Sequence, residues 1–337
     1  MLRRLCVDDR GWLTDAEVED GIAAVNLLPG PASTQLAIWT AWRVGGPLGA
    51  VVGGLAFVLP GLALIVALAA VFLASPPRWL LAAAAGAGAA VAAVAVQSAG
   101  ALLKPSWTRT ESRQRWLLYL AAGLAVGAVD GSWVVIVLVA CGLVEVGARR
   151  GSVPLVALPF GGGGGLLWVA LKVGLLSYGG GFVIIPLMQH DAVDRFHWMS
   201  DAQFLNAVAL GQLTPGPVVH TVAVVGYAAG GLAGALLAAT AAFAPSFAMV
   251  LTGARRFDAL RASPAVTAFL AGAGPAVIGA IAGSAVPLAL ALAEWWQAGV
   301  LAAAGLLLAL RRGVVPTLLL AGVAGVVVGA LGGALPR

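Results

Sequence analysis

Long apolar runs alternate with short polar stretches along this chain. A helix needs about 20 apolar residues to cross the hydrocarbon core of a bilayer, and nine runs reach or approach that length. They cover residues 47–74, 79–103, 116–129, 133–144, 166–187, 232–253, 264–292, 295–310 and 314–335. The pattern predicts an all-α, polytopic integral membrane protein.

Two further apolar regions, residues 15–45 and 201–230, are each interrupted in the middle by a pair of prolines around a glycine. We expect each to form a broken helical hairpin, either as two short crossings or as a re-entrant pair. Irregular backbone at membrane depth is tolerated only where it is buried in protein or lines a cavity. The breaks are therefore expected in the interior.

The two broken regions resemble each other, which indicates a tandem duplication. An offset of 186 residues places Pro29-Gly30-Pro31 on Pro215-Gly216-Pro217, and after a one-residue gap an offset of 185 places Gly45-Gly46 on Gly230-Gly231 and Pro60 on Pro245. We predict an N-terminal repeat over residues 1–150, a glycine-rich linker over residues 151–165 and a C-terminal repeat over residues 166–337.

Composition excludes a water-soluble protein. Hydrophobic residues make up 61% of the 337 residues and charged residues 10%, against about 25% charged in soluble domains. The net charge of +5 does not indicate a nucleic-acid partner, because the basic residues form short clusters between apolar runs, as loops obeying the positive-inside rule do. Cys6 and Cys141 indicate neither a disulfide framework nor a metal site, and we expect no cofactor.

The basic residues also orient the two halves. If each broken hairpin returns to its own side and each remaining run crosses once, fourteen Lys and Arg residues lie on the cytoplasmic side and three, Arg78, Arg195 and Arg337, lie outside. This split requires the second half to be inserted upside down. Inverted-topology repeats with broken helices are the architecture of secondary transporters.

The Pro-Gly-Pro breaks are the candidate substrate site. Each ends one helix and begins another, so unpaired N–H groups and the positive end of a helix dipole face the break. Such a position suits an anion, although a kink for packing is the alternative. Candidate contacts are Pro29, Gly30, Pro31, Ser33, Thr34 and Gln35 in the first half, and Pro215, Gly216, Pro217, His220 and Thr221 in the second.

A second group of candidates lies in the run over residues 166–187. Lys172 could supply a positive charge to an anion or could extend to the cytoplasmic interface. Ser177, Tyr178, Gly179, Gly180 and Gly181 could unwind the helix and expose backbone donors, or could serve close packing. Arg43, at the end of the first hairpin, is either a helix-end anchor or a ligand contact.

Acidic residues near the first hairpin are candidate proton carriers. Glu19 and Asp20 align with the uncharged Leu205 and Asn206 of the second half, so an ionisable pair is present in one repeat alone. His220, which titrates near neutral pH, is the other candidate. No nucleophile signature or metal-ligand spacing appears, and we do not expect an enzyme.

These motifs resemble the chromate ion transporter family. The resemblance rests on Leu-Leu-Pro-Gly-Pro-Ala-Ser-Thr-Gln at residues 27–35, Ser-Tyr-Gly-Gly-Gly-Phe at residues 177–182 and Gln-Leu-Thr-Pro-Gly-Pro at residues 212–217. It implies a multi-pass carrier of the bacterial inner membrane that exports chromate, with sulfate as competitor or counter-substrate. A homodimer is a candidate assembly.

The sequence departs from the family pattern at its start. Family members open with a helix that carries Phe-Gly-Gly-Pro, and by the repeat offset this helix would precede Met1. The resemblance thus implies a first repeat that lacks its first helix. A sulfate or other small-anion transporter and a truncated, non-transporting membrane protein are the alternatives to a secondary active chromate exporter.

Overall fold

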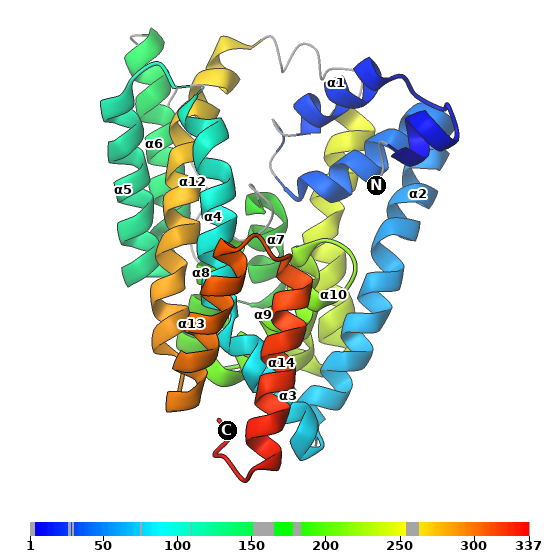
Figure 1. The fold of residues 1–337 in the computed structure, drawn as a ribbon. Coiled ribbons are helices and arrows are strands. Elements are labelled where there is room, and N and C mark those ends of the chain that lie inside the picture. The colour runs from blue at the N-terminus through cyan, green and yellow to red at the C-terminus, as the bar shows by residue number, and fades with distance from the viewer. Residues whose placement is uncertain are drawn as a thin grey trace.

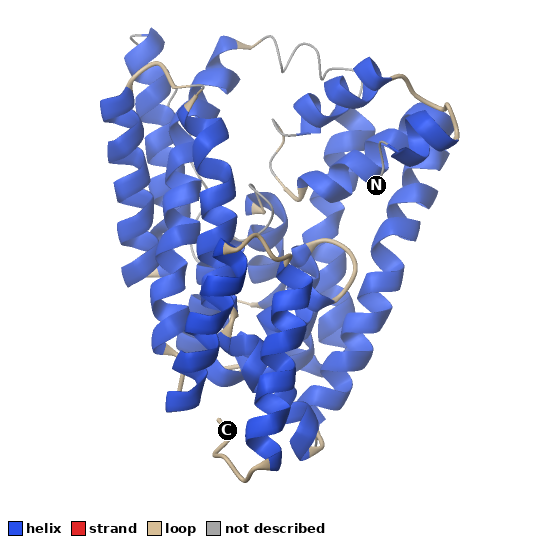
Figure 2. Cartoon of the chain, viewed as in Figure 1, coloured by secondary structure: helices blue, strands red, loops and turns tan. Residues whose placement is uncertain are grey.

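The computed structural model describes residues 4–25, 28, 30–74, 76–108, 110–150, 165–177, 183–253 and 263–336, with the backbone alone for Asp20, Ala23 and Ala24. Within these residues every regular element is a helix (Figure 2), which confirms the predicted all-α class. The helices are α1 (Asp15–Val25), α2 (Ala32–Ala74), α3 (Arg78–Ala89), α4 (Val91–Trp107), α5 (Arg113–Val129), α6 (Val134–Arg150), α7 (Leu166–Leu176), α8 (Ile184–Gln189), α9 (Asp201–Leu213), α10 (Thr221–Gly253), α12 (Pro264–Leu290), α13 (Trp295–Ala309) and α14 (Val314–Ala330). Short 3-10 or π segments cover Arg4–Asp9, Gly131–Trp133, His190–Arg195 and Val218–His220.

The two longest helices, α2 and α10, are bent at matching glycine pairs. Gly46 has φ 61° and ψ −154°, and Gly231 has φ 60° and ψ −150°. This region of backbone space is essentially restricted to glycine. The same conformation therefore occurs at positions related by the 185-residue offset.

Helices α2 and α10 pack together in opposite directions. A Cβ built on Gly54 of α2 would touch the ring of Phe247, whereas one built on Gly61 would touch His220, whose ring packs on Phe243. Residue numbers rise along α2 as they fall along α10. Figure 1 shows the same arrangement, with the later part of α2 descending and the later part of α10 rising.

The first arm of each broken hairpin is a helix too short to cross a bilayer. Helix α1 has 11 residues and α9 has 13, which at 1.5 Å per residue correspond to about 16 and 20 Å. The hydrocarbon core is about 30 Å thick. The re-entrant alternative thus fits the helix lengths.

The prediction that residues 166–187 cross the membrane once is wrong. Lys172 on α7 contacts Asp191 beyond α8, with 2.5 Å between Nζ and Oδ2. A continuous helix would separate these two residues by about 28 Å, so the chain folds back between α7 and α8. A buried carboxylate requires a compensating charge, and the reversal supplies it.

The last two predicted runs form shorter helices than expected. Helices α13 and α14 have 15 and 17 residues, and Figure 1 shows the turn between them partway along the height of the molecule. The count of basic residues predicted that this turn, which contains Arg311 and Arg312, lies on the same side as the upper ends of α5 and α6. The turn instead lies below those ends.

Glycine residues bring helices α5 and α12 into close contact. A Cβ on Gly123 or Gly127 of α5 would lie 1.9 or 2.4 Å from a backbone oxygen of α12, and one on Gly279 would lie 2.0 Å from Leu120 O of α5. Glycine at these positions lets the helix backbones touch, which is how membrane helices commonly associate.

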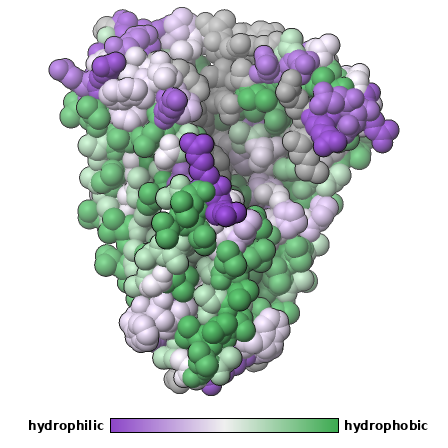
Figure 3. All heavy atoms as spheres, in the orientation of Figure 1, coloured by the Kyte–Doolittle hydropathy of each residue, from purple (hydrophilic) through white to green (hydrophobic). Residues whose placement is uncertain are grey.

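The outer surface is suited to lipid. Five helical stretches are long and apolar enough to span a membrane, namely Ala32–Ala74, Arg78–Trp107, Gly131–Arg150, Val218–Gly253 and Pro264–Leu290. Figure 3 shows hydrophilic side chains gathered at the upper end and hydrophobic ones over the body below. Exposed Leu and Val side chains on these helices would face lipid rather than water.

Candidate anion-binding site

The two Pro-Gly-Pro breaks have the same central conformation. Gly30 has φ +118° and Gly216 has φ +130°, a range that favours glycine. Helix α2 begins directly after Pro31, with Gln35 N donating to Pro31 O at 3.0 Å. After Pro217 the first turn is tighter, and His220 N donates to Pro217 O at 3.0 Å.

This difference in the first turn explains the one-residue gap in the repeat. The bond after Pro31 spans four residues and the bond after Pro217 spans three. Gln35 and His220 consequently take corresponding positions: a Cβ on Gly30 would lie 2.7 Å from Gln35 Nε2, and one on Gly216 would lie 2.7 Å from His220 Cε1.

Each break packs against the other half of the chain. The Cβ built on Gly30 would lie 3.1 Å from Gly174 O of α7 and 3.2 Å from Ser246 Oγ of α10. In the second break, Pro215 O would lie 2.4 Å from a Cβ on Gly61 of α2. Gly61 and Ser246 are related by the 185-residue offset, so the halves exchange equivalent contacts.

Buried polar atoms without a hydrogen-bond partner gather on the elements around the breaks. They include Thr34 Oγ1, Ser177 Oγ, His220 Nδ1 and Ser246 Oγ, and each of these residues is 0% exposed. Buried polar groups are nearly always hydrogen-bonded. Unsatisfied polar atoms at this density, among the described residues, indicate that a ligand or water completes them.

Other predicted site residues are placed differently. Pro31 and Pro217 are buried, Pro215 and Gly216 are exposed, and Ser33 is exposed at the start of α2. Thr221 is buried and its Oγ1 donates to Val218 O at 2.8 Å, so it stabilises the turn. Pro29, Tyr178, Gly179, Gly180 and Gly181 lie outside the described residues.

Lys172 is largely buried and its charge is compensated. Its side chain is 10% exposed and pairs with Asp191, which is 1% exposed and also lies 3.8 Å from Arg195 Nη1. The ammonium group neither extends to the surface nor stands as a free positive charge.

The remaining charged candidates lie on the outer part of the first hairpin. Arg43 forms an ion pair with Glu17 and lies over the ring of Trp39, as a helix-end anchor would. Glu19 is exposed on α1, and the side chain of Asp20 lies outside the described part of the structure.

Two residues of the site escaped the sequence reasoning. Ser246 follows Pro245, which the repeat had aligned with Pro60, so the aligned prolines were a usable signal. Asp191 lies in a stretch that the pattern shows as a loop, and no local feature indicates that it is buried beside Lys172.

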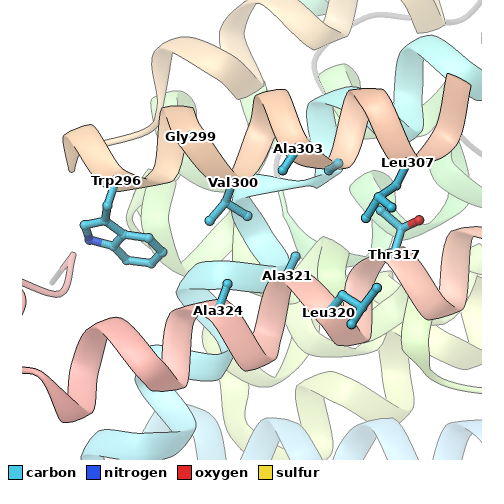
Figure 4. Close-up of a pocket in the computed structure, with 10 residues that line it drawn as sticks. Trp296, Gly299, Val300, Ala303, Leu307, Thr317, Leu320, Ala321 and Ala324 are labelled. Carbon is cyan, nitrogen blue, oxygen red and sulfur yellow. The ribbon is translucent and has the colours of Figure 1, made fainter. Parts of the chain in front are cut away.

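Among the described residues, neither a metal-ligand cluster nor the cavity between α13 and α14 offers an alternative anion site. The described residues contain no group of three or more His, Cys, Asp or Glu that could hold a metal ion. A cavity of about 260 Å³ lies between α13 and α14 (Figure 4), lined by Trp296, Val300, Leu307 and other apolar residues. Its one hydroxyl, Thr317 Oγ1, donates to Gly313 O at 2.9 Å, so the cavity offers no free donor.

Comparison with known proteins agrees with the family resemblance. The family model described as "Chromate transporter" matches residues 1–146 and 164–330. The "Chromate transport protein" of Cupriavidus metallidurans is 32% identical over 309 residues, covering 86% of this chain and 76% of the relative. The protein of that name from Pseudomonas aeruginosa is 32% identical over 328 residues, covering 87% and 76%.

A third relative, the "Probable chromate transport protein" of Synechococcus elongatus, is 30% identical over 308 residues, covering 85% of this chain and 78% of the relative. No solved structure matches the chain. Together with the apolar helices, these matches show a multi-pass protein of the plasma membrane. The chain belongs to the chromate transporter family.

Proposed function

We propose that this protein is a secondary active transporter that exports chromate, a tetrahedral divalent oxyanion, across the plasma membrane. Family membership and three relatives named for chromate transport support the substrate. The observation that carries the proposal is the pair of Pro-Gly-Pro breaks, each with a positive-φ glycine and with buried, unpartnered polar atoms beside it.

The anion would bind between the breaks through neutral donors. Helix α2 begins at the first break and α10 follows the second, so partial positive charge lies at both. Hydroxyl groups of Thr34, Ser177 and Ser246 could donate to oxygens of the anion. Lys172 stays a proposed contact, although its pairing with Asp191 reduces the charge it can offer.

Transport would use the inverted repeat. The opposite directions of α2 and α10, and the equivalent contacts of Gly61 and Ser246, support two halves related by inversion, with the boundaries at residues 150 and 166. Rocking of one half against the other around a fixed midplane site is the usual transport movement of such proteins. Glu19 and Asp20 stay predicted proton carriers, and a homodimer stays the predicted assembly.

Sulfate is the second candidate substrate. Hydroxyl, imidazole and backbone N–H donors recognise the oxygens of a tetrahedral dianion and do not contact its central atom. Competition of sulfate with chromate uptake into inverted vesicles would measure the preference between the two anions.

The test of the export proposal is chromate accumulation in cells. Expression should lower accumulation, and Gly30→Val or Gly216→Val should abolish the effect, because each β-carbon would meet Gln35 or His220 at 2.7 Å and each φ is positive. Gly100→Val is the matched control, since nothing lies within 4 Å of a Cβ at that position. Equal accumulation in expressing and control cells, with the protein present in the membrane, would refute export.

A further inference from the structure

One ring nitrogen of His220 is hydrogen-bonded, and the other has no partner among the described residues. The residue is 0% exposed, and Nε2 lies 3.1 Å from Val58 O of α2. A carbonyl oxygen accepts only, so Nε2 carries the hydrogen and donates it. In the neutral imidazole Nδ1 then has a lone pair, and no described residue donates to it.

The free nitrogen faces the second Pro-Gly-Pro break. A Cβ on Gly216 would lie 2.9 Å from Nδ1, and one on Gly61 would lie 3.0 Å from it. The edge of the ring thus lies against two glycines, and Gly216 is exposed while His220 is not. Nδ1 therefore lies directly beneath the backbone of the break, next to its exposed glycine.

Among the described residues of the surrounding elements, no other group changes from neutral to positive near neutral pH. The turn containing His220 packs on α2, α9 and α10, whose ionisable residues are Arg43, Asp201 and Tyr227. Arg43 pairs with Glu17, and Asp201 accepts from Gln189. A tyrosine phenol can only lose its proton and become negative. The recorded neighbours Val58, Gly61, Pro215, Gly216 and Phe243 are not ionisable.

We propose that His220 takes up a proton together with the oxyanion and releases both on the other side. Nδ1 accepts a proton from water, the imidazolium donates Nδ1–H to an oxygen of the anion, and Nε2–H stays on Val58 O. A buried imidazolium without a counter-ion is costly, so protonation and anion binding favour each other. This inference rests on the proposed function of the breaks as the anion site.

The repeat adds an internal comparison. Gln35 holds the position in the first half that His220 holds in the second, and an amide does not titrate near neutral pH. One half would thus carry the proton. A dianion that leaves with one proton moves one net negative charge, which an inside-negative membrane potential still drives outward.

The experiment measures proton and chromate flux in proteoliposomes containing the full chain and a trapped pH dye, at a pH alkaline enough to keep chromate a dianion. Wild type should move a proton with each chromate. His220→Gln, which makes the two halves alike, should lower the number of protons moved per chromate by about tenfold or more, whatever the rate at which it exchanges labelled chromate. His197→Gln is the matched control, because His197 is exposed, and it should behave as wild type.

A measurement on wild type alone tests the proposal even if the His220→Gln variant does not fold. Addition of chromate to the purified protein in weakly buffered alkaline solution should cause uptake of protons. Absence of that uptake with chromate bound, or an unchanged proton-to-chromate ratio in His220→Gln, would overturn the role of His220. Absence of chromate flux in wild type would instead overturn the proposed function.

Discussion

At the scale of single residues, the buried carboxylate of Glu145 accepts several hydrogen bonds, most of them from positively charged side chains. Glu145 of α6 is 3% exposed and accepts from Arg115 Nε at 2.8 Å, Tyr119 Oη at 3.1 Å and Arg149 Nε at 2.7 Å. Removal of a carboxylate from such a network leaves its donors unsatisfied in a poorly solvated place.

We expect Glu145→Gln to lower the free energy of unfolding by about 2 kcal/mol, the range for hydrogen bonds to charged groups. Thermal unfolding in detergent measures the effect. The side chain of Glu111, which also pairs with Arg149, is 65% exposed, and Glu111→Gln should cost less than about 1 kcal/mol. Equal losses in the two variants would show that Glu145 does not hold the network together.

At the scale of elements, backbone conformation rather than packing holds the bends of α2 and α10. Nothing lies within 4 Å of a Cβ on Gly45, Gly46, Gly230 or Gly231. Gly46 and Gly231 have positive φ, whereas Gly45 has φ −129° and Gly230 has φ −160°, which other residues adopt.

Gly46→Ala and Gly231→Ala should each cost about 1 to 3 kcal/mol through backbone strain. Gly45→Ala and Gly230→Ala, one residue away in the same open space, should be neutral or stabilise slightly. Melting temperatures of the four variants in one detergent make the comparison. If the two variants at one bend, for example Gly45→Ala and Gly46→Ala, lose the same stability, contacts or lipid rather than φ hold that bend.

At the scale of the whole molecule, the proposed inverted repeat predicts which side of the membrane each turn faces. Figure 1 shows the turn from α4 to α5 at the upper end and the turn from α2 to α3 at the lower end. The positive-inside rule predicts that the former lies in the cytoplasm and the latter outside.

Cysteine labelling in intact cells tests this topology. A membrane-impermeant maleimide should label Arg78→Cys and Asp194→Cys directly but Glu111→Cys only after permeabilisation. Wild type gives the background, because Cys6 and Cys141 are 2% and 7% exposed. Labelling of Glu111→Cys and Asp194→Cys from the same side would contradict the inversion.

The sequence alone determined that the protein lies in a membrane and is all-α, and it predicted the two Pro-Gly-Pro breaks and the repeat. These properties follow from hydropathy, proline and glycine, whose effects are local and can be read along the chain. The single crossing predicted over residues 166–187 was wrong because the reversal there brings together Lys172 and Asp191, which lie far apart along the chain.

Only the tertiary structure decided which polar atoms meet. His220 reaches Val58, 162 residues away, Ser246 lies beside Gly30, and Lys172 is neutralised by Asp191. The gap in the repeat acquired its meaning in the same way, since a tighter turn after Pro217 brings His220 into the position of Gln35. Such contacts depend on the packing of distant segments, and side-chain type along the sequence does not specify which distant partner each will meet.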